Sequence, residues 1–267
     1  MVKSAERVAI ALQFLANNPS GPSYSDLQRG LDLPKSSLHA LLDTLVSTRL
    51  ASFDEDTKRY ALGPLVWELA MAFSNQLQIV PLALPHLERL GATFGETVQL
   101  AILDHTEVVY VAKTTSRHPI QLVSNVGTRL PAYATGLGKA LLACLSEEQI
   151  ERLYPNPVLE RFTADTVATI PQLIEELETT RRRGYATDRG EYSLGIHCIA
   201  VPIVTAANVP KAAISISIPG QRYIQYDEQT LVEAIVSEAY SVAGKLGALN
   251  PDSWRHPTSS QPDFPSV

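Results

Sequence analysis

The chain has 267 residues, enough for two ordinary domains, and 45% of them are hydrophobic, which supports buried cores. Its formal net charge of −6 argues against a strongly basic protein that coats nucleic acid. Two cysteines make neither a disulfide framework nor a metal site, so we expect no cofactor and no metal. We find no signal peptide and no apolar run of membrane-spanning length, so we expect a cytoplasmic location and no membrane partner.

The charge is unevenly distributed along the chain. Residues 1–62 carry seven Lys or Arg and seven Asp or Glu, whereas the remaining 205 residues carry 15 basic and 21 acidic side chains. A neutral N-terminal part on an acidic body is compatible with DNA contact through that part alone.

Three short helices are predicted at the start of the chain. Ser4 caps the first, which runs to about Asn17, and Ser23 caps the second. The third lies within Leu33–Leu45 and includes Pro34, a residue that suits the first turn of a helix. Helices this closely spaced are typical of a helix-turn-helix.

The third helix has the pattern of a DNA-recognition helix. Its leucines recur at i, i+3, i+4 and i+7 and share one face, so small and polar side chains occupy the other: Ser36, Ser37, Ala40 and Asp43. Small side chains let a helix approach base edges in the major groove. An ordinary amphipathic surface helix has the same pattern, and the helix alone does not distinguish the two.

A hairpin is predicted next, with strands at 50–53 and 58–62 around a polar turn. After a helix-turn-helix such a hairpin is a wing, and its Lys58 and Arg59 are placed to contact phosphates or the minor groove. A plain surface hairpin with an acidic tip is the alternative.

The residues from Pro64 to Gln76 predict an apolar helix with few charges, which we expect to link two domains and to pack against a partner chain. The expected domains are a winged helix-turn-helix in residues 1–63, the linker in 64–78 and a larger, sensor-like domain in 79–249. The end of the chain, residues 250–267, holds four prolines and is expected to be disordered.

The second domain alternates between strand and helix patterns. Strands are predicted at 97–103, 107–114, 120–123, 199–204 and 212–218, and helices at 80–94, 138–144, 147–153, 170–183 and 227–246. This order indicates an α+β fold in which helices cover a mixed antiparallel sheet.

The glycine-rich stretch Thr135–Ala140 is not a phosphate loop. Tyr133 stands where the first glycine should be, and Ala140 replaces the Ser or Thr that would hold Mg²⁺. The stretch still suits an anion such as a carboxylate, or it is a plain turn into a helix. Tyr133 is placed to stack on an aromatic ring, which favours an aromatic or hydroxy acid as the ligand.

Ser215 and Ser217 alternate with isoleucines and share one face of a predicted strand. That face is either exposed to solvent or the wall of a pocket, where two hydroxyls would bind a carboxylate.

The sequence offers no catalytic set. His197 and Cys198 are neighbours on an extended segment and point to opposite sides, so they cannot pair. Asp188 and Glu191 form a carboxylate pair, but no nucleophile or metal cluster accompanies them. We therefore expect no enzymatic activity.

Taken together and in this order, the segments resemble the IclR family of bacterial transcription regulators, from Ser4 to Gly247. The resemblance rests on residues 33–39, the hairpin, 60–63, 95–101, 134–143, 184–188 with Glu191, and 198–203. It implies a winged helix-turn-helix joined by a linker helix to a GAF-like mixed α/β effector domain. It also implies a homodimer or homotetramer that controls a catabolic operon in response to a small organic acid.

By the same resemblance the effector lies between the sheet and the glycine-rich stretch. The implied effector-binding residues are Leu122, Gly136, Leu137, Asp188, Ile196, Cys198, Ser215 and Ser217. Asp188 would orient a ligand hydroxyl or a loop N–H, because a bare carboxylate repels an acid.

The chain departs from the family at Ala40, since the family usually has arginine after the histidine of the recognition helix. The change removes a strong guanine or phosphate contact. The expected DNA-contacting residues are Lys35, Ser36, Ser37, His39 and Ala40 of the helix, with Lys58 and Arg59 of the hairpin.

We therefore expect an effector-responsive regulator, a repressor rather than an activator, that binds double-stranded operator DNA. Two alternatives stay open. One is a sensor or interaction module that has lost DNA binding, which Ala40 favours. The other is an enzyme acting on a small acid, which the lack of a nucleophile–base set disfavours.

Overall fold

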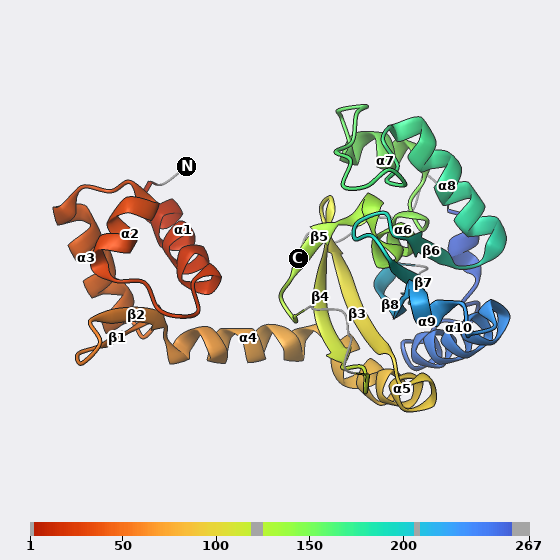
Figure 1. Ribbon diagram of the computed structural model, residues 1–267, viewed down its shortest axis with the longest axis horizontal. Helices are drawn as coiled ribbons and strands as arrows, with labels where there is room; N and C mark the ends of the chain where they lie inside the picture. The colour runs from red at the N-terminus through yellow and green to blue at the C-terminus, as the bar shows by residue number, and fades with distance from the viewer. Residues whose placement is uncertain (1–2, 119–124, 206–208, 258–267) are drawn as a thin grey trace. The chain divides into compact units, whose positions relative to one another are not determined.

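The computed structural model describes residues 3–118, 125–205 and 209–257 (Figure 1). The chain folds into two compact units, Met1–Leu77 and Gln78–Val267. None of the helices in the described ranges is both long and apolar enough to cross a membrane.

The first unit is a helix-turn-helix with a hairpin and a final helix. Its elements are α1 (Lys3–Asn17), α2 (Tyr24–Leu31), α3 (Lys35–Ser47), β1 (Ala51–Asp54), β2 (Arg59–Leu62) and α4 (Pro64–Leu77). Ser23 begins α2 with a capping box, because its hydroxyl accepts from the Asp26 N–H and the Asp26 carboxylate accepts from the Ser23 N–H. Leucines from all three helices form the core, including Leu15, Leu27 and Leu38.

The second unit is a six-stranded antiparallel sheet covered by helices. Its strands are β3 (Thr97–Asp104), β4 (Glu107–Thr114), β5 (Arg129–Pro131), β6 (Ala186–Arg189), β7 (Ile196–Val204) and β8 (Pro210–Pro219), in the spatial order β5-β4-β3-β8-β7-β6. The helices are α5 (Ile79–Phe94), η1 (Ala132–Ala134), α6 (Gly136–Leu142), α7 (Glu147–Leu153), α8 (Ile170–Arg183), α9 (Gly220–Tyr223), α10 (Glu228–Lys245) and η2 (Ser253–Arg255). The expected α+β fold is confirmed.

Both faces of the sheet are covered, and this determines which side chains meet. In β3, seven consecutive residues from Thr97 to Leu103 are buried. Alternate residues point to opposite faces, and Ala101 and Leu103 belong to the same core cluster as the residues of α6. Residues at the same alternation in β7 and β8 therefore also face α6, whereas α5 and α10 pack against each other and the sheet (Figure 1).

Several sequence-based expectations were incomplete. The short strands β5 and β6 were missed, and β7 begins at Ile196 rather than at 199. These strands contain polar or charged residues such as Arg129 and Asp188, so they lack a continuous apolar pattern. The strand expected at 120–123 lies outside the described residues.

The expectation of disorder from residue 250 onward is wrong for residues 250–257. The turn η2 lies there, and Trp254 is 0% exposed within the main core. The proline and serine content of the segment predicted disorder, because composition does not show that a single tryptophan is buried. Burial of this large aromatic side chain offsets the loss of conformational entropy when a short segment becomes ordered.

We predict that Trp254→Ala lowers the free energy of unfolding of the second unit by ~3–5 kcal/mol, because a large aromatic side chain leaves a cavity. Chemical denaturation followed by circular dichroism measures this. The matched control is Leu249→Ala, at a side chain that is 99% exposed, and it should leave stability unchanged. Equal stability of the two variants would refute the anchoring role.

Candidate DNA-contacting surface and ligand pocket

Helix α3 presents the expected face to solvent. Lys35, Ser36, His39 and Ala40 are exposed, whereas Ser37 is only partly exposed. The hydrophobic stripe, Leu38, Leu42 and Leu45, is fully buried against the rest of the first unit. The start of α3 is held by the Tyr24 hydroxyl, which donates to the Lys35 carbonyl at 2.8 Å. The arrangement leaves a small, polar helix face on a rigid core, as major-groove contact requires.

The hairpin presents its two basic residues differently. Lys58 is exposed and pairs with Glu55 at 2.9 Å, a surface contact that a phosphate can replace at little cost. The Arg59 guanidinium donates to the Gly21 carbonyl and so ties the hairpin to the turn between α1 and α2. Contact between Arg59 and a phosphate would require this internal bond to be exchanged or shared.

In the second unit, sheet register brings polar residues from distant parts of the sequence into one row. Asp188 of β6 pairs directly with Cys198 of β7, and Cys198 pairs with Ser217 of β8. A parallel row contains Ser215 of β8 opposite Gln99 of β3. All five side chains lie on the face that α6 covers.

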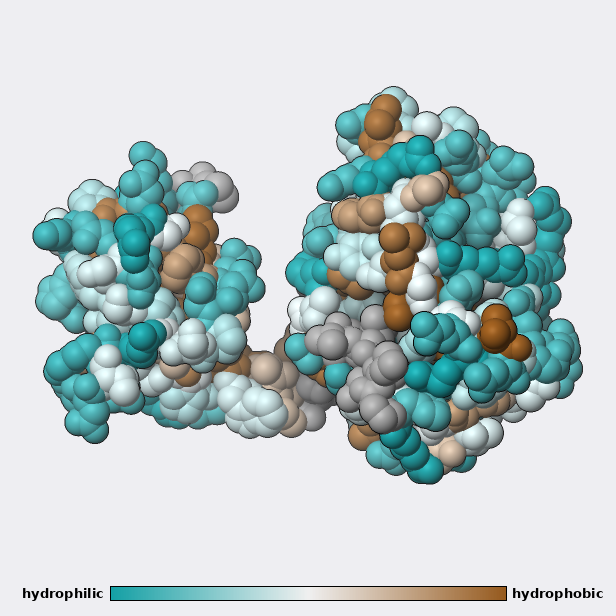
Figure 2. Space-filling view, in the orientation of Figure 1, coloured by the Kyte–Doolittle hydropathy of each residue, from teal (hydrophilic) through white to brown (hydrophobic). Residues whose placement is uncertain are grey.

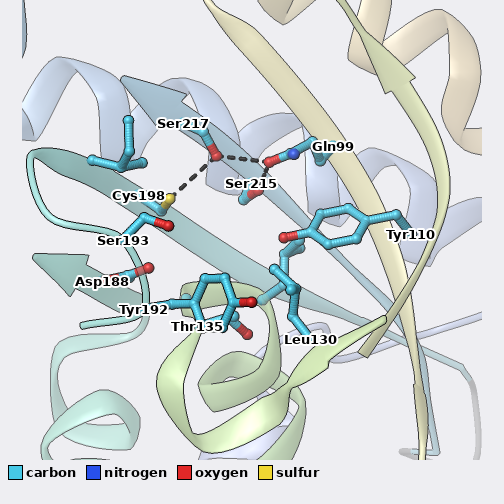
Figure 3. Close-up of a pocket in the computed structure, with 13 residues that line it drawn as sticks. Gln99, Tyr110, Leu130, Thr135, Asp188, Tyr192, Ser193, Cys198, Ser215 and Ser217 are labelled. Carbon is cyan, nitrogen blue, oxygen red and sulfur yellow. Dashed lines mark hydrogen bonds between the residues drawn. The ribbon is translucent and has the colours of Figure 1, made fainter. Parts of the chain in front are cut away.

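These rows form the wall of a cavity (Figure 3). Seven of the eight implied effector-binding residues line it, and Leu122 lies outside the described residues. The described residues that line it are Gln99, Tyr110, Leu130, Thr135, Gly136, Leu137, Asp188, Tyr192, Ser193, Ile196, Cys198, Ser215 and Ser217. Its volume is about 40 Å³, room for a few water molecules, so a larger occupant must displace side chains.

Hydrogen bonds link the two serines to a residue that the sequence analysis missed. The Ser217 hydroxyl donates to Gln99 Oε1 at 2.7 Å, and the Ser215 hydroxyl does so at 3.4 Å. Cys198 Sγ lies 3.2 Å from Ser217 Oγ. The serine face is therefore a buried pocket wall and not a solvent-exposed face. The available sequence signal for Gln99 was a glutamine inside the otherwise apolar run 98–103 of a predicted strand.

The glycine-rich stretch is explained by close packing. A Cβ on Gly138 would lie 2.1 Å from the Ala132 carbonyl oxygen, so only glycine fits there. The Thr135 hydroxyl accepts from the Gly138 N–H and begins α6, all seven residues of which are buried. At its other end, Arg181 of α8 donates to the carbonyl of Ala143 at 2.8 Å.

Tyr133 does not face the cavity, contrary to expectation. Its ring contacts Tyr154 and Phe162, and its hydroxyl donates to the Glu160 carbonyl at 2.9 Å. Tyr133 lies in the short 3-10 helix η1 and is not among the described residues that line the cavity. Among the described residues, the aromatic ones that line the cavity are Tyr110 and Tyr192, whose hydroxyls point into it in Figure 3.

A buried ion pair lies beside the cavity. Lys139 of α6 is 1% exposed, and its Nζ lies 2.5 Å from the Glu191 carboxylate and 3.5 Å from that of Glu176. Burial raises the pKa of Glu191, although the lysine opposes this. The carboxylates that the sequence suggested as a pair therefore have separate roles, because Glu191 pairs with Lys139 while Asp188 lines the cavity.

Asp188 is itself buried and lies at a turn. Its Oδ1 accepts from the N–H groups of Gly190 and Glu191, at 3.0 and 2.8 Å. Burial raises the pKa of its carboxyl to about 7, despite these two hydrogen bonds. His197 lies on the other face, where it stacks on Tyr223, so it does not pair with Cys198. Within the described ranges no group of three or more metal-ligating side chains occurs.

We predict that Lys139→Met destabilises the second unit by ~3–5 kcal/mol, because Glu191 is left buried without a cation. The pKa of Glu191 would rise further, so the loss should be largest at pH 8 and shrink as the pH falls and the carboxylate gains a proton. Denaturation at pH 8 and pH 5.5 measures it.

The double variant Lys139→Met with Glu191→Leu is the matched control, and it should recover most of the stability at pH 8. A loss that is equal at both pH values, or no recovery in the double variant, would contradict the buried-pair account.

Comparison with known proteins identifies the family of both units. The model of the IclR helix-turn-helix domain matches residues 4–55, and that of the bacterial transcriptional regulator IclR C-terminal domain matches residues 71–243. The chain is 32% identical over 249 residues to the HTH-type transcriptional repressor AllR of Salmonella typhimurium, which covers 93% of this chain and 92% of that protein. It is 31% identical over 245 residues to AllR of Escherichia coli K12, covering 92% and 90%.

Solved structures are similar over the same length. The IclR of Thermotoga maritima has a TM-score of 0.75 at 28% identity and covers 92% of this chain and 100% of that chain. An IclR homologue from Microbacterium hydrocarbonoxydans, complexed with 4-hydroxybenzoate, has a TM-score of 0.81 at 29% identity, covering 91% and 99%. The chain therefore belongs to the IclR family of DNA-binding transcription regulators, which are not enzymes.

Proposed function

We propose that this regulator is a repressor of a catabolic operon and that a small organic acid, bound in the cavity of the second unit, controls it. The observation that carries the proposal is the polar row Asp188, Cys198 and Ser217 at the wall of a buried cavity in a chain that also exposes a recognition-type helix. The AllR relatives named as repressors support the sign of regulation. The homologue complexed with 4-hydroxybenzoate supports an acid as effector.

The proposed effector site consists of the residues that line the cavity. It includes Gly136, Leu137, Asp188, Ile196, Cys198, Ser215 and Ser217, together with Gln99 and the hydroxyls of Tyr110 and Tyr192. Leu122 remains a proposed member. Hydroxyl and amide groups can bind both a carboxylate and a ligand hydroxyl, so hydroxy acids and phenolic acids fit this lining.

The proposed DNA surface consists of Lys35, Ser36, Ser37, His39 and Ala40 at the start of α3, with Lys58 and Arg59 of the hairpin. Lysine and arginine would neutralise phosphates, whereas the small residues would approach base edges. The winged helix-turn-helix would comprise residues 1–63, the linker 64–78 and the effector domain 79–249.

Helix α4 offers the surface through which we expect two copies to associate. Trp67 is 69% exposed, and Leu69, Met71 and Phe73 are also exposed on the same short helix. Figure 2 shows pale to brown, more hydrophobic residues along α4. Exposed apolar side chains at this density mark an interaction site, and a second copy would bring two recognition helices to one palindromic operator.

The test is a mobility-shift titration with DNA from upstream of the protein's own coding region, at two salt concentrations and with a panel of small organic acids. We expect saturable binding that weakens with salt, because phosphate contacts release counterions, and that one acid weakens further. Binding that no acid alters would refute effector control. Absence of specific binding at low salt would favour the interaction-module alternative.

We predict that Ala40→Arg strengthens operator binding and steepens the dependence of log affinity on log salt by ~1, because one more phosphate or guanine contact forms. Ala5→Arg, at an exposed position of α1, adds the same charge elsewhere and is the control. If both variants behave alike, α3 is not the contacting helix.

We predict that Trp67→Glu shifts the protein towards monomer in analytical ultracentrifugation, because a carboxylate would be buried in the proposed interface. Affinity for a palindromic site should fall with it. Leu249→Glu, at an apolar residue of the second unit that is 99% exposed, should leave the oligomer unchanged. A Trp67→Glu protein that stays oligomeric would show that α4 is not the interface.

A further inference from the structure

The cavity has an unusual charge for a site that takes an acid. Of the described residues that line it, none carries a positive charge, and one is Asp188. The nearby buried lysine does not supply the missing charge, since Lys139 pairs with Glu191 and Glu176 and does not line the cavity. The pairing of Lys139 with these carboxylates leaves none of its positive charge to balance an ionised Asp188 before any ligand enters.

The other groups around Asp188 do not change this balance. Cys198 of β7 lies directly opposite Asp188. Tyr110 of β4 and Tyr192 of the loop after β6 line the same cavity. Burial raises the pKa of the Cys198 thiol and of the Tyr110 phenol, so both stay neutral donors.

The cations nearest in sequence are directed elsewhere. Arg189, the next residue of β6, lies 3.6 Å from the Glu228 carboxylate of α10. His197 stacks on Tyr223 on that same outer side. Arg183 of α8 lies 3.6 Å from the carboxylate of Glu176, which is the second partner of Lys139. An anion in the cavity would therefore meet an ionised Asp188 without a compensating lining cation.

The hydrogen bonds of Asp188 leave one oxygen for a ligand. Both backbone donors, the N–H groups of Gly190 and Glu191, contact Oδ1. Oδ2 is thus the oxygen left to meet an occupant of the cavity. A proton on Oδ2 turns it from a repelling acceptor into a hydrogen-bond donor, and the two bonds to Oδ1 are kept.

We propose that Asp188 receives the acid effector as a neutral carboxylic acid, with its Oδ2–H donating to the effector's carboxylate, so that one proton from solvent is bound with each anion. This inference rests on the proposed acid effector. Asp188 would then select for ligands that carry an acceptor carboxylate at that point of the cavity.

The expected pH dependence follows from the free protein. Burial raises the pKa of Asp188 to about 7, so the carboxyl is mostly protonated at pH 6 and mostly ionised at pH 8. Anion binding favours the protonated form and raises this pKa further. Affinity should therefore be nearly constant below pH 6 and should fall by about tenfold between pH 6 and pH 8.

The test is isothermal titration calorimetry of the full chain with acetate, lactate, benzoate and 4-hydroxybenzoate. Titrations at pH 6, 7 and 8 give the affinity, and titrations at pH 8 in phosphate and in Tris give the number of protons taken up. For any acid that binds, we expect uptake approaching one proton at pH 8 and the tenfold loss of affinity.

Two variants separate the effect of the Asp188 proton on acid binding from the effect of the other hydrogen-bond donors in the cavity. Asp188→Asn keeps a carbonyl oxygen for the two N–H groups and an N–H donor for the ligand, so it should bind with no proton uptake and with the same affinity at pH 6 and pH 8. Ser217→Ala removes a different donor and should weaken binding equally at both pH values while keeping the uptake.

Acid binding by the wild-type chain without proton uptake at pH 8 would overturn the inference and leave the acid effector standing. Loss of acid binding at every pH in a folded Asp188→Asn protein would also overturn it, because an ionised carboxylate would then be required. If none of the four acids binds the wild-type chain at any pH, the acid effector itself is refuted, and the role of Asp188 with it.

Discussion

A helix that is buried on every side must satisfy its polar groups inside the protein, and α6 is such a helix. Its one charged residue, Lys139, is paired with Glu191. The turn that carries Glu191 also provides the N–H groups that hold Asp188. The ion pair therefore fixes α6 against the turn after β6, and the cavity exists in the space between them. Gly138 permits the close approach of η1 on the other side.

Because α6 forms part of the cavity wall, a ligand that enters the cavity can change the position of α6. The cavity is small, so an entering acid must displace side chains such as Tyr192 or move α6 relative to the sheet. Closely packed interiors respond to such insertion by shifting between discrete arrangements rather than by continuous deformation. The acid can change DNA binding only to the extent that it favours one of those arrangements over the other.

Much of the fold followed from patterns of apolar residues, whereas the site depended on register. The spacing of leucines predicted α3, and the alternation around Ser215 and Ser217 predicted a strand with one polar face. Whether that face was wet or buried needed the position of α6, which no local pattern contains. Lys139 was missed for the same reason, because a lysine in a helix is usually solvated. Tyr133 was misplaced because successive residues of a 3-10 helix point in different directions. Trp254 was missed because the composition of a segment does not show that one of its residues is buried.

We propose that occupancy of the cavity and binding of operator DNA are coupled. Coupling is reciprocal, so DNA must change the affinity for the acid by the same factor by which the acid changes the affinity for DNA. The most direct measurement is the affinity of the protein for its acid effector with and without saturating operator DNA at one fixed pH and salt concentration. For a repressor released by its effector, we expect weaker acid binding in the presence of DNA, by the factor found in the reverse titration. An acid affinity that operator DNA leaves unchanged would contradict it.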